Sequence, residues 1–289
     1  MPGETERAVH GQAGWLRGVP TDRQLPADAS VVHTGCGTSF HAAQTGGWAV
    51  QALEAVLTPP AADVLVAVSH EGETALTLEA VRAFRGQTWL VTGRPESPLA
   101  DAVDEVVVAT PELERSWCHT ASYTCAVAAI DALHGIDISW LPAAVDEAVR
   151  QPVEAGLPDR VLVTGAGRDW ATAQEAVLKL REGARVAAEA FETEQLLHGY
   201  LAAVAPGTRA FVLEGEGRAA ERAHELARVL RALDVEVTVL PTRHPVVDIV
   251  YFQLLTLAEA AARGLDPDAI AREPGSPLAE ATGEAYPQS

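Results

Sequence analysis

Three ionisable residues in this sequence have helical spacing: Glu175, Lys179 and Glu182 are separated by four and then three positions. In an α-helix this spacing places all three side chains on one face. Lys179 is the single lysine of the chain, against twenty arginines. An ammonium can lose its proton and a guanidinium cannot, so this lysine is a candidate for acid–base chemistry. The alternative is an exposed stripe of ion pairs, each worth roughly a few tenths of a kcal/mol.

Two glycine turns add hydroxyl groups to the set of candidates. Residues 35–39 read GCGTS and residues 69–74 read SHEGET, each directly after a short apolar run. Glycine lets a backbone approach a ligand closely, and hydroxyls and N–H groups at a helix start bind anions. Taken alone, each turn is equally well explained as a tight strand-to-helix connection, with Ser39 as an N-cap. Two such turns on successive strands indicate one small polar ligand.

The elements that must position these groups alternate along the chain. Short apolar runs predict strands at 31–35, 64–69, 89–93, 105–110, 160–167, 210–215 and 236–241. Amphipathic stretches predict helices at 38–53, 73–85, 169–187, 217–233 and 246–263. Continuous apolar strands that alternate with helices are typical of parallel sheets covered on both faces. The sequence therefore predicts an α/β fold, in which ligands bind at the carboxyl ends of the strands.

The strands form two groups, separated by a proline-containing segment. We predict an N-terminal helical segment (1–27), a first domain (28–135), a linker helix (136–158) and a second domain with a C-terminal tail (159–289). Each half begins with an apolar strand, a glycine turn and a helix, which indicates an internal duplication.

Composition excludes several classes of function. Forty acidic against 21 basic residues give a formal net charge of −19, which argues against binding nucleic acid or an anionic membrane. Neither a run of about 18 apolar residues nor a signal-like start is found, so no membrane span is expected. Three cysteines without a CxxC pair make the reducing cytoplasm the expected location. Neither HExxH nor GxGxxG occurs, so we expect no metal and no cofactor.

Three motifs together resemble the sugar isomerase (SIS) domain family: GCGTS, SHEGET and, at 188–199, AEAFETEQLLHG. The resemblance is greatest to the tandem-SIS isomerase half of glucosamine-6-phosphate synthases and covers about residues 30–270. It implies two flavodoxin-like SIS domains in tandem, each a parallel sheet flanked by helices. It also implies a homodimer with sites near the interface, and a phosphorylated sugar as ligand. Thirty residues precede the first predicted strand, so we expect the glutaminase domain of those enzymes to be absent.

The resemblance assigns the phosphate cradle to the two glycine turns. Together with the hydroxyls of the first turn and a histidine in the segment ERSWCHTASYT (114–124), the predicted substrate-binding residues are Gly37, Thr38, Ser39, Ser69, His70, Glu71, Thr74 and His119. His119 could donate to an anion or to sugar oxygens, or be a core histidine. In the same segment, Trp117 could stack on a sugar ring or belong to the core.

Glu71 departs from the family pattern, which usually reads SQSGET where this chain reads SHEGET. A carboxylate ~4 Å from a phosphate is repelled by about 4 kcal/mol at an effective dielectric of 20. Glu71 could point away from the ligand and leave only its backbone N–H there. It could be neutralised by a proton, by His70 or by an arginine. As a third alternative, the ligand has no phosphate at this turn.

The catalytic roles also come from the resemblance. It implies that Glu182 moves a proton between carbons 1 and 2 of the open sugar, that His198 of the neighbouring subunit assists ring opening, and that Lys179 lies beside Glu182. An enediol or enolamine route needs such a carboxylate, and a nearby cation stabilises the developing negative charge. The same helix face is expected to extend to Glu189. The tail has Arg272 but no lysine, so an imine to the sugar could form only at Lys179.

These observations predict a sugar isomerase, or an isomerase/deaminase, that acts on a phosphosugar or amino-sugar phosphate. The sequence does not separate isomerase from deaminase. One alternative is a non-catalytic protein that senses sugar phosphates, since binding needs the turns but not the acid–base groups. The other is an isomerase of an unphosphorylated sugar.

Overall fold

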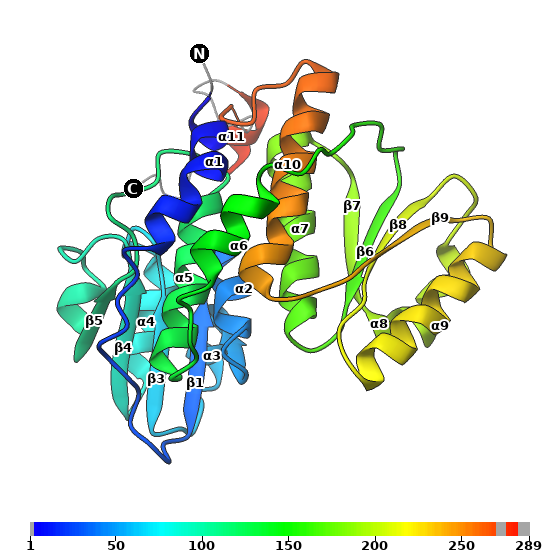
Figure 1. Ribbon diagram of the computed structural model, residues 1–289. Coiled ribbons are helices and arrows are strands. Elements are labelled where there is room, and N and C mark those ends of the chain that lie inside the picture. The colour runs from blue at the N-terminus through cyan, green and yellow to red at the C-terminus, as the bar shows by residue number, and fades with distance from the viewer. Residues whose placement is uncertain (1–2, 270–275, 283–289) are drawn as a thin grey trace.

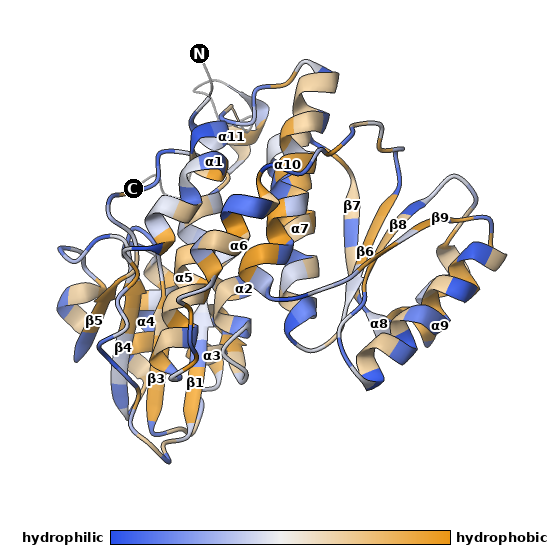
Figure 2. Ribbon diagram, viewed as in Figure 1, coloured by the Kyte–Doolittle hydropathy of each residue, from blue (hydrophilic) through white to orange (hydrophobic). Residues whose placement is uncertain are grey.

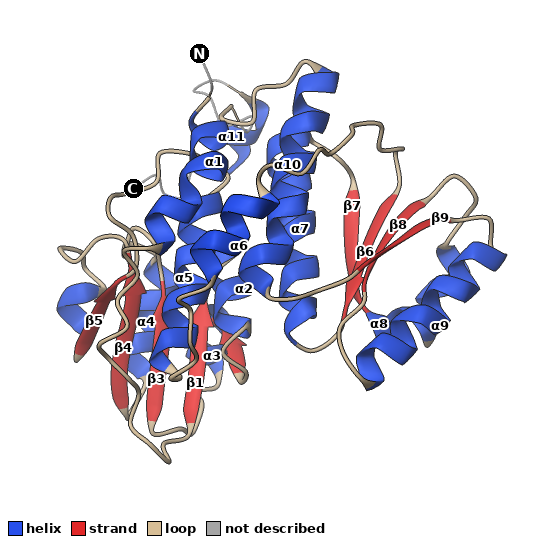
Figure 3. Ribbon diagram, in the orientation of Figure 1, coloured by secondary structure: helices blue, strands red, loops and turns tan. Residues whose placement is uncertain are grey.

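A computed structural model describes residues 3–269 and 276–282 of the chain. Two parallel sheets, one from each half, lie on opposite sides of a layer of helices (Figures 1 and 3). This arrangement confirms the predicted α/β fold with parallel sheets flanked by helices.

The first sheet has the strand order β2-β1-β3-β4-β5, which is the order of flavodoxin-like sheets. Its strands are β1 Val31–Gly35, β2 Ala49–Gln51, β3 Val64–Val68, β4 Gln87–Thr92 and β5 Glu105–Val108. The helices of this half are α1 Glu4–Leu16, α2 Thr38–Gln44, α3 Ala52–Leu57, α4 Ala75–Ala83, the short 3₁₀ helix Ala100–Ala102 and α5 Thr120–Leu133.

The second sheet repeats this order with one strand fewer, as β7-β6-β8-β9. Its strands are β6 Val161–Gly165, β7 Ala188–Glu192, β8 Arg209–Leu213 and β9 Glu236–Leu240. The helices are α6 Leu141–Ala148, which precedes β6, then α7 Arg168–Ala184, α8 Thr193–Leu197, the 3₁₀ helix Tyr200–Ala203, α9 Arg218–Ala232, α10 Pro245–Arg263 and α11 Pro277–Thr282.

One apolar core joins the inner faces of both sheets through the central helices. Alternate residues of β3, such as Val64 and Val66, face this core, as does Val163 of β6. Their neighbours Leu65 and Leu162 face separate outer clusters under α4 and α9. The inner strands β3 and β6 are therefore apolar on both sides, which explains their continuous apolar runs in the sequence (Figure 2). The shared core fixes α7 of the second half against α2 of the first.

The helix α10 has the length and apolar composition of a membrane span. Its most apolar window is 61% buried inside the protein, and the helix packs along α7 in the central layer (Figure 1). A core helix meets the same criteria of length and composition, so α10 is explained by the fold.

Three expectations about elements are wrong. The predicted helix 38–53 is divided, because the Gly46–Gly47 break is followed by β2 and α3; a side chain at Gly46 would collide with the ring of His33. The helix expected over 169–187 ends at Ala184, since Arg185 has a left-handed backbone. Glu189 therefore lies in β7 and not on the α7 face. The motif at 188–199 consists of β7 followed by the short α8.

Candidate functional site

The two hydroxyl-bearing turns lie side by side at the carboxyl edge of the first sheet. β1 and β3 are adjacent strands, and Thr34 pairs with Ala67, so both turns leave the sheet at the same edge. Gly37, with a φ of 54°, begins the helix α2, and Thr38 and Ser39 follow in its first turn. Gly37, and not Ser39, is thus the N-cap. The structure brings together the two predicted parts of the substrate site.

The second turn is closed by its own hydroxyls. Ser69 Oγ accepts a hydrogen bond from the backbone N–H of Gly72 at 3.2 Å and lies 3.3 Å from Thr74 Oγ1. Gly72 has a φ of 69°, and a side chain there would collide with Ser97. Ser69 is buried, while Thr74 begins α4 and is exposed. The hydroxyl pair therefore connects the base of the turn to its open face.

His70 and His119 form one unit behind this turn. His70 Nε2 accepts a hydrogen bond from the backbone N–H of Glu114 at 2.8 Å. The two imidazole rings meet edge to face, with centroids 5.5 Å apart. Burial, with a smaller contribution from His119, lowers the pKa of His70 to about 4, and the charges of Glu114 and Glu71 act in the opposite direction. His70 is therefore neutral near pH 7 and ties the segment before α5 to the turn, while Glu71 lies close enough to act on it.

Glu114 anchors that segment at the start of α5, a role that sequence reasoning missed. Its buried carboxylate accepts backbone N–H bonds from Thr120 at 2.8 Å and Ser122 at 2.6 Å, and hydroxyl bonds from Ser116 and Thr120. Burial alone would raise the pKa of Glu114, but the hydrogen bonds from Ser116 and Ser122 outweigh it and hold the pKa below its usual value. A carboxylate at a helix N-terminus also satisfies free N–H groups. The segment that ends in His119 is thereby fixed.

The three ionisable residues of α7 form a buried cluster and not an exposed stripe. Lys179 Nζ lies 3.3 Å from Glu175 Oε1 and 2.9 Å from Glu182 Oε2. Glu175 and Lys179 are 0% and 1% exposed, whereas 28% of the Glu182 side chain reaches solvent. Burial of such an ion pair carries a large desolvation penalty, so this cluster differs from the exposed ion pairs of a protein surface. Glu182 is thus the member that a substrate can reach.

Lys179 joins this cluster to the first half of the chain. Its Nζ donates to Thr38 Oγ1 at 3.2 Å and to the backbone carbonyl of Cys118. Burial would lower the pKa of the ammonium, but Glu175 and Glu182 outweigh burial and raise the pKa above its usual value. Lys179 is therefore charged and fully bonded, which suits electrostatic stabilisation and does not suit a nucleophile that must first lose its proton.

His41 is a second residue that sequence reasoning missed. It lies on α2, three residues after Thr38, and its Nδ1 is 2.7 Å from Glu175 Oε2. The spacing from Thr38 to His41 places both on one helix face, which is the signal that could have found it.

His198 lies apart from this cluster within the described residues of the chain. Its side chain is 74% exposed and pairs with Glu194 at 2.9 Å, one turn earlier. Glu194 is in turn held by Arg222, at 2.7 and 2.9 Å. The predicted tail residue Arg272 lies outside the described residues.

The carboxyl edge of the second sheet is acidic. Asp169 Oδ2 accepts from Thr242 Oγ1 at 3.0 Å, and burial and Glu216 raise its pKa. Glu214 pairs with His224 at 2.8 Å. Among the residues that the structure describes, no three His, Cys, Asp or Glu side chains gather as metal ligands. This edge therefore offers carboxylates where the first edge offers hydroxyls.

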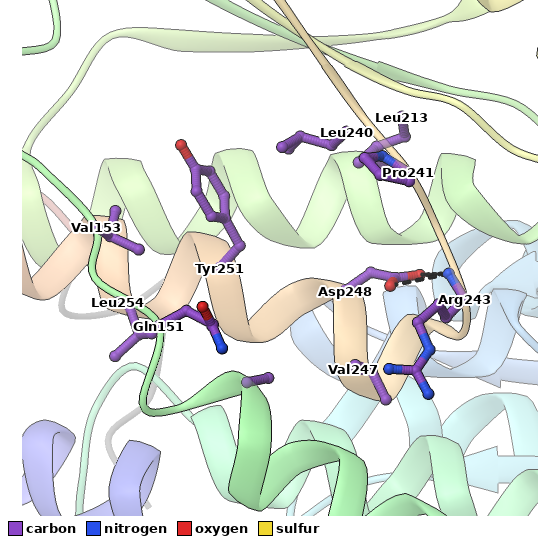
Figure 4. Close-up of a pocket in the computed structure, with 11 residues that line it drawn as sticks. Gln151, Val153, Leu213, Leu240, Pro241, Arg243, Val247, Asp248, Tyr251 and Leu254 are labelled. Atoms are coloured by element: carbon purple, nitrogen blue, oxygen red, sulfur yellow. Dashed lines mark hydrogen bonds between the residues drawn. The ribbon is translucent and has the colours of Figure 1, made fainter.

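A cavity of about 200 Å³ lies near this second edge, between α10, β9 and the segment after α6 (Figure 4). Its walls are mostly apolar, with Tyr251 at one end and Asp248 near Arg243 at the other. Burial raises the pKa of Asp248 to about 7, although its carboxylate accepts backbone N–H bonds from Arg243 and His244. Ligand pockets usually measure about 300–1,000 Å³, so this cavity is small for a hexose phosphate.

The α/β fold places the ion cluster of α7 beside two hydroxyl-bearing turns. Together they form a candidate site for a small polar molecule. Residues 158–244 match the family model of the SIS domain. The chain thus contains a SIS domain in its second half, and it is homologous to the isomerase half of glutamine–fructose-6-phosphate aminotransferases.

The relatives agree with this assignment. The chain is 26% identical over 309 residues to glutamine–fructose-6-phosphate aminotransferase (isomerizing) of Symbiobacterium thermophilum, covering 85% of this chain and 51% of that protein. It is 29% identical over 301 residues to the Aeropyrum pernix enzyme, covering 81% and 48%. The chain spans about half the length of the curated relatives it matches.

Solved structures share the fold across nearly the whole chain. A glucosamine-6-phosphate deaminase from Thermotoga maritima superposes with a TM-score of 0.73 at 19% identity, covering 95% of this chain and 98% of that one. A tagatose-6-phosphate ketose/aldose isomerase from Escherichia coli gives 0.75 at 19% identity, covering 92% and 94%. The C-terminal domain of glucosamine-fructose-6-phosphate aminotransferase from Francisella tularensis gives 0.74 at 18%, covering 93% and 98%.

Proposed function

We propose that the chain interconverts the aldose and ketose forms of a phosphosugar or amino-sugar phosphate, with or without release of ammonia. The observation that carries this proposal is the position of Glu182. Its carboxylate is partly exposed and lies 2.9 Å from a buried ammonium that also reaches the first-half turn at Thr38. Proton transfer next to a carbonyl needs a positioned base, and a fixed cation nearby stabilises the negative charge that develops on the oxygen.

In the proposed reaction, the open sugar lies with carbons 1 and 2 next to Glu182. The carboxylate takes a proton from one carbon, which leaves an enediol or, from an amino sugar, an enolamine. The ammonium of Lys179 stabilises the negative charge that develops on the oxygen. Glu182 then returns the proton to the other carbon, while the hydroxyl proton passes from one oxygen to the other, so that the carbonyl moves to the neighbouring carbon. In a deaminase, return of the proton to carbon 1 of the enolamine leaves an imine at carbon 2, which water hydrolyses to the ketone with release of ammonia.

The distal end of the sugar is assigned to the turns of the first sheet. Ser39, Ser69 and Thr74 supply hydroxyls, and α2 and α4 begin at these turns. Hydroxyls and helix starts can hold a phosphate in a strongly acidic protein, since solution salt screens distant charges over ~8 Å. Two of the related structures are named for enzymes of sugar 6-phosphates, which supports a phosphorylated ligand here.

Glu71 supports a second candidate, the isomerisation of an unphosphorylated sugar. It lies in the turn assigned to the phosphate and acts electrostatically on His70. A carboxylate accepts hydrogen bonds from sugar hydroxyls, whereas it repels a phosphate. A non-catalytic sensor is less well supported, because binding alone does not need Lys179 to be buried beside Glu182.

We also propose a homodimer of tandem SIS domains, with the first-half domain over residues 28–135. Exposed apolar side chains lie around the edge strand β2 and helix α3, namely Trp48, Leu53 and Leu57. His198 is exposed, as a residue supplied to a partner's site would be. Free Cys36, Cys118 and Cys125 agree with a reducing cytoplasm.

A substrate panel tests these proposals. Tagatose 6-phosphate, fructose 6-phosphate, glucosamine 6-phosphate and their unphosphorylated forms are incubated with the protein. Interconversion is followed by NMR and ammonia release by a coupled assay. Thermal shifts report binding separately, since a ligand at 100 times its dissociation constant stabilises by about 2.7 kcal/mol. Turnover of a phosphorylated sugar supports the first candidate, and turnover of only unphosphorylated sugars supports the second. Binding without any turnover contradicts both.

A further inference from the structure

His41 lies behind the ion cluster and contacts only its inner carboxylate among the cluster residues that the structure describes. Its Nδ1 donates to Glu175 Oε2 at 2.7 Å. The imidazole is 13% exposed and Glu175 is 0% exposed, so this bond is shielded from water. His41 belongs to α2 and Glu175 to α7, and the bond therefore joins the first half of the chain to the second.

The two oxygens of Glu175 divide their partners. Oε1 accepts from Thr38 Oγ1 at 3.2 Å and lies 3.3 Å from Lys179 Nζ. Within the described parts of the chain, the one hydrogen bond to Oε2 comes from His41. A buried carboxylate oxygen without a donor carries a large desolvation penalty. If His41 were removed, the donors still in contact with Glu175 would be the Thr38 hydroxyl and the Lys179 ammonium, and the charged ammonium makes the stronger hydrogen bond to a carboxylate.

That ammonium is shared with Glu182. Lys179 has three N–H bonds for Glu182, the Cys118 carbonyl and the pair formed by Thr38 and Glu175. A stronger demand from Glu175 would draw Lys179 away from Glu182, whose bond to Nζ is 2.9 Å long. The donor on Glu175 Oε2 thus decides how one cation is divided between two carboxylates.

We propose that His41 is a positioning residue of the site: by satisfying Glu175, it holds the Lys179 ammonium against Glu182. This inference rests on the proposed function in one respect, namely that Glu182 acts as the base. His41 acts through Glu175 and not on the sugar. Positioning of a catalytic charge within a fraction of an ångström is a recognised contribution to rate.

Three variants of His41 separate the effect of the hydrogen-bond donor from the effect of side-chain volume. His41→Asn places an amide N–H on the same side-chain carbon position as Nδ1, so it can still donate to Glu175. His41→Gln moves the amide one carbon further, to the position of Nε2, and His41→Leu removes the donor. We expect His41→Asn to keep the wild-type behaviour, and His41→Gln and His41→Leu to be impaired to a similar degree. The comparison of Asn with Gln remains valid if the Leu variant does not fold.

The activity readout separates positioning from binding. For Gln and Leu we expect kcat to fall about tenfold or more, the usual loss for a hydrogen bond to a charged group, with KM changed by less than about threefold. For Asn, kcat stays within about threefold of wild type. A residue needed only for folding would lower the yield of active protein and leave kcat of the folded fraction unchanged.

The single lysine permits a direct readout that needs no substrate. Protein labelled with ¹⁵N at lysine Nζ gives one ammonium signal, which belongs to Lys179. Burial and three hydrogen bonds slow its proton exchange with water in the wild type. Loss of the His41 donor redistributes these bonds, so we expect the Gln and Leu variants to shift the signal and to speed exchange at least about tenfold. The Asn variant keeps the wild-type signal.

These outcomes distinguish the inference from the proposed function. If wild type turns over none of the sugars in the panel, the proposed function fails, while the ammonium signal still reports the effect of His41. The inference is overturned if Gln and Leu leave the Lys179 signal unchanged, or if Asn is as impaired as Gln in folded protein. It is supported if the signal and kcat both follow the donor.

Discussion

The two sheets share one strand order over four strands, but the side chains at their carboxyl edges differ in chemical type. The first edge presents the hydroxyls of Thr38, Ser69 and Thr74, and the second presents carboxylates such as Asp169 and Glu214. The cation of the site comes from α7, which starts at the second edge and packs its middle turns against α2 of the first half. A repeated fold therefore does not imply two equivalent sites. In the proposed site, the second half supplies the reactive groups and the first half supplies the turns.

We expect the largest difference in stability between two variants that each remove a cation, one at the buried Lys179 and one at the exposed Arg243. Lys179→Met leaves the buried carboxylate of Glu175 and the partly exposed carboxylate of Glu182 without their shared cation, and we expect unfolding to cost about 3–5 kcal/mol less than in wild type. The control Arg243→Met removes an exposed cation near the second edge and should cost about 0.5 kcal/mol or less. Urea denaturation measures both. Equal losses would show that Lys179 is an ordinary surface charge.

The carboxylates that cap α5 and α10 provide a second contrast. Glu114→Gln replaces an ion that accepts two backbone N–H bonds, so we expect a loss of about 2 kcal/mol. Asp248→Asn should cost less than about 1 kcal/mol at pH 6, because the pKa of Asp248 is raised to about 7 and its charge is already partly lost. Denaturation of both variants at pH 6 gives the comparison. A larger loss for Asp248→Asn would reverse the roles that we assign to these two carboxylates.

Ligand binding should depend on hydroxyls at the first edge alone. Ser69→Ala is expected to weaken binding of the panel sugar with the largest thermal shift by about tenfold, since one hydrogen bond is lost. Thr242→Ala removes a hydroxyl from the second edge and should leave binding unchanged. Isothermal titration measures both, and melting without ligand controls for damage to the turn. Equal weakening by both variants would place the ligand elsewhere.

A further contrast is the pH dependence of stability at His70. Its pKa is lowered to about 4, from about 6.5 in the unfolded chain, so unfolding takes up a proton between these values. Stability from this group therefore falls as the pH decreases from about 6.5 to about 4. His70→Gln keeps an acceptor for the N–H of Glu114 and should reduce this slope by about one proton. His33, whose pKa is also about 4, preserves the rest of the slope. An unchanged slope would show that His70 is not buried in its neutral form.

Most of the fold could be predicted from the sequence, because buried parallel strands such as β3 and β6 are continuous apolar runs. The edge strands β2 and β7 could not, since one is three residues long and the other, AEAFE, alternates with charges. Edge strands are covered less completely, so their patterns resemble those of loops and helices.

The sequence predicted which residue types belong to the candidate site, but not which of their side chains contact one another. Helical spacing and the single lysine pointed to Glu175, Lys179 and Glu182 without showing that two of them are buried. His41 was missed because its partner Glu175 lies 134 residues away, on a helix that only the folded chain brings near. Glu114 was missed because its local partners, up to eight residues away, lie in a loop and helix start whose backbone path the sequence pattern does not define. His198 was predicted through a resemblance, and its exposed position leaves that role as a prediction.

The measurement that tests the central claim most directly is the interconversion rate of the preferred panel sugar in two matched variants. Glu182→Gln removes the proposed base at the first edge, and Glu214→Gln makes the same change at the second edge. We predict that Glu182→Gln slows interconversion about 10³-fold with unchanged melting, because general base catalysis contributes about 10²–10⁴. Glu214→Gln should retain the wild-type rate. Wild-type turnover by Glu182→Gln, or an equal loss in both variants, would contradict the assignment of the active site to α7 and the first edge.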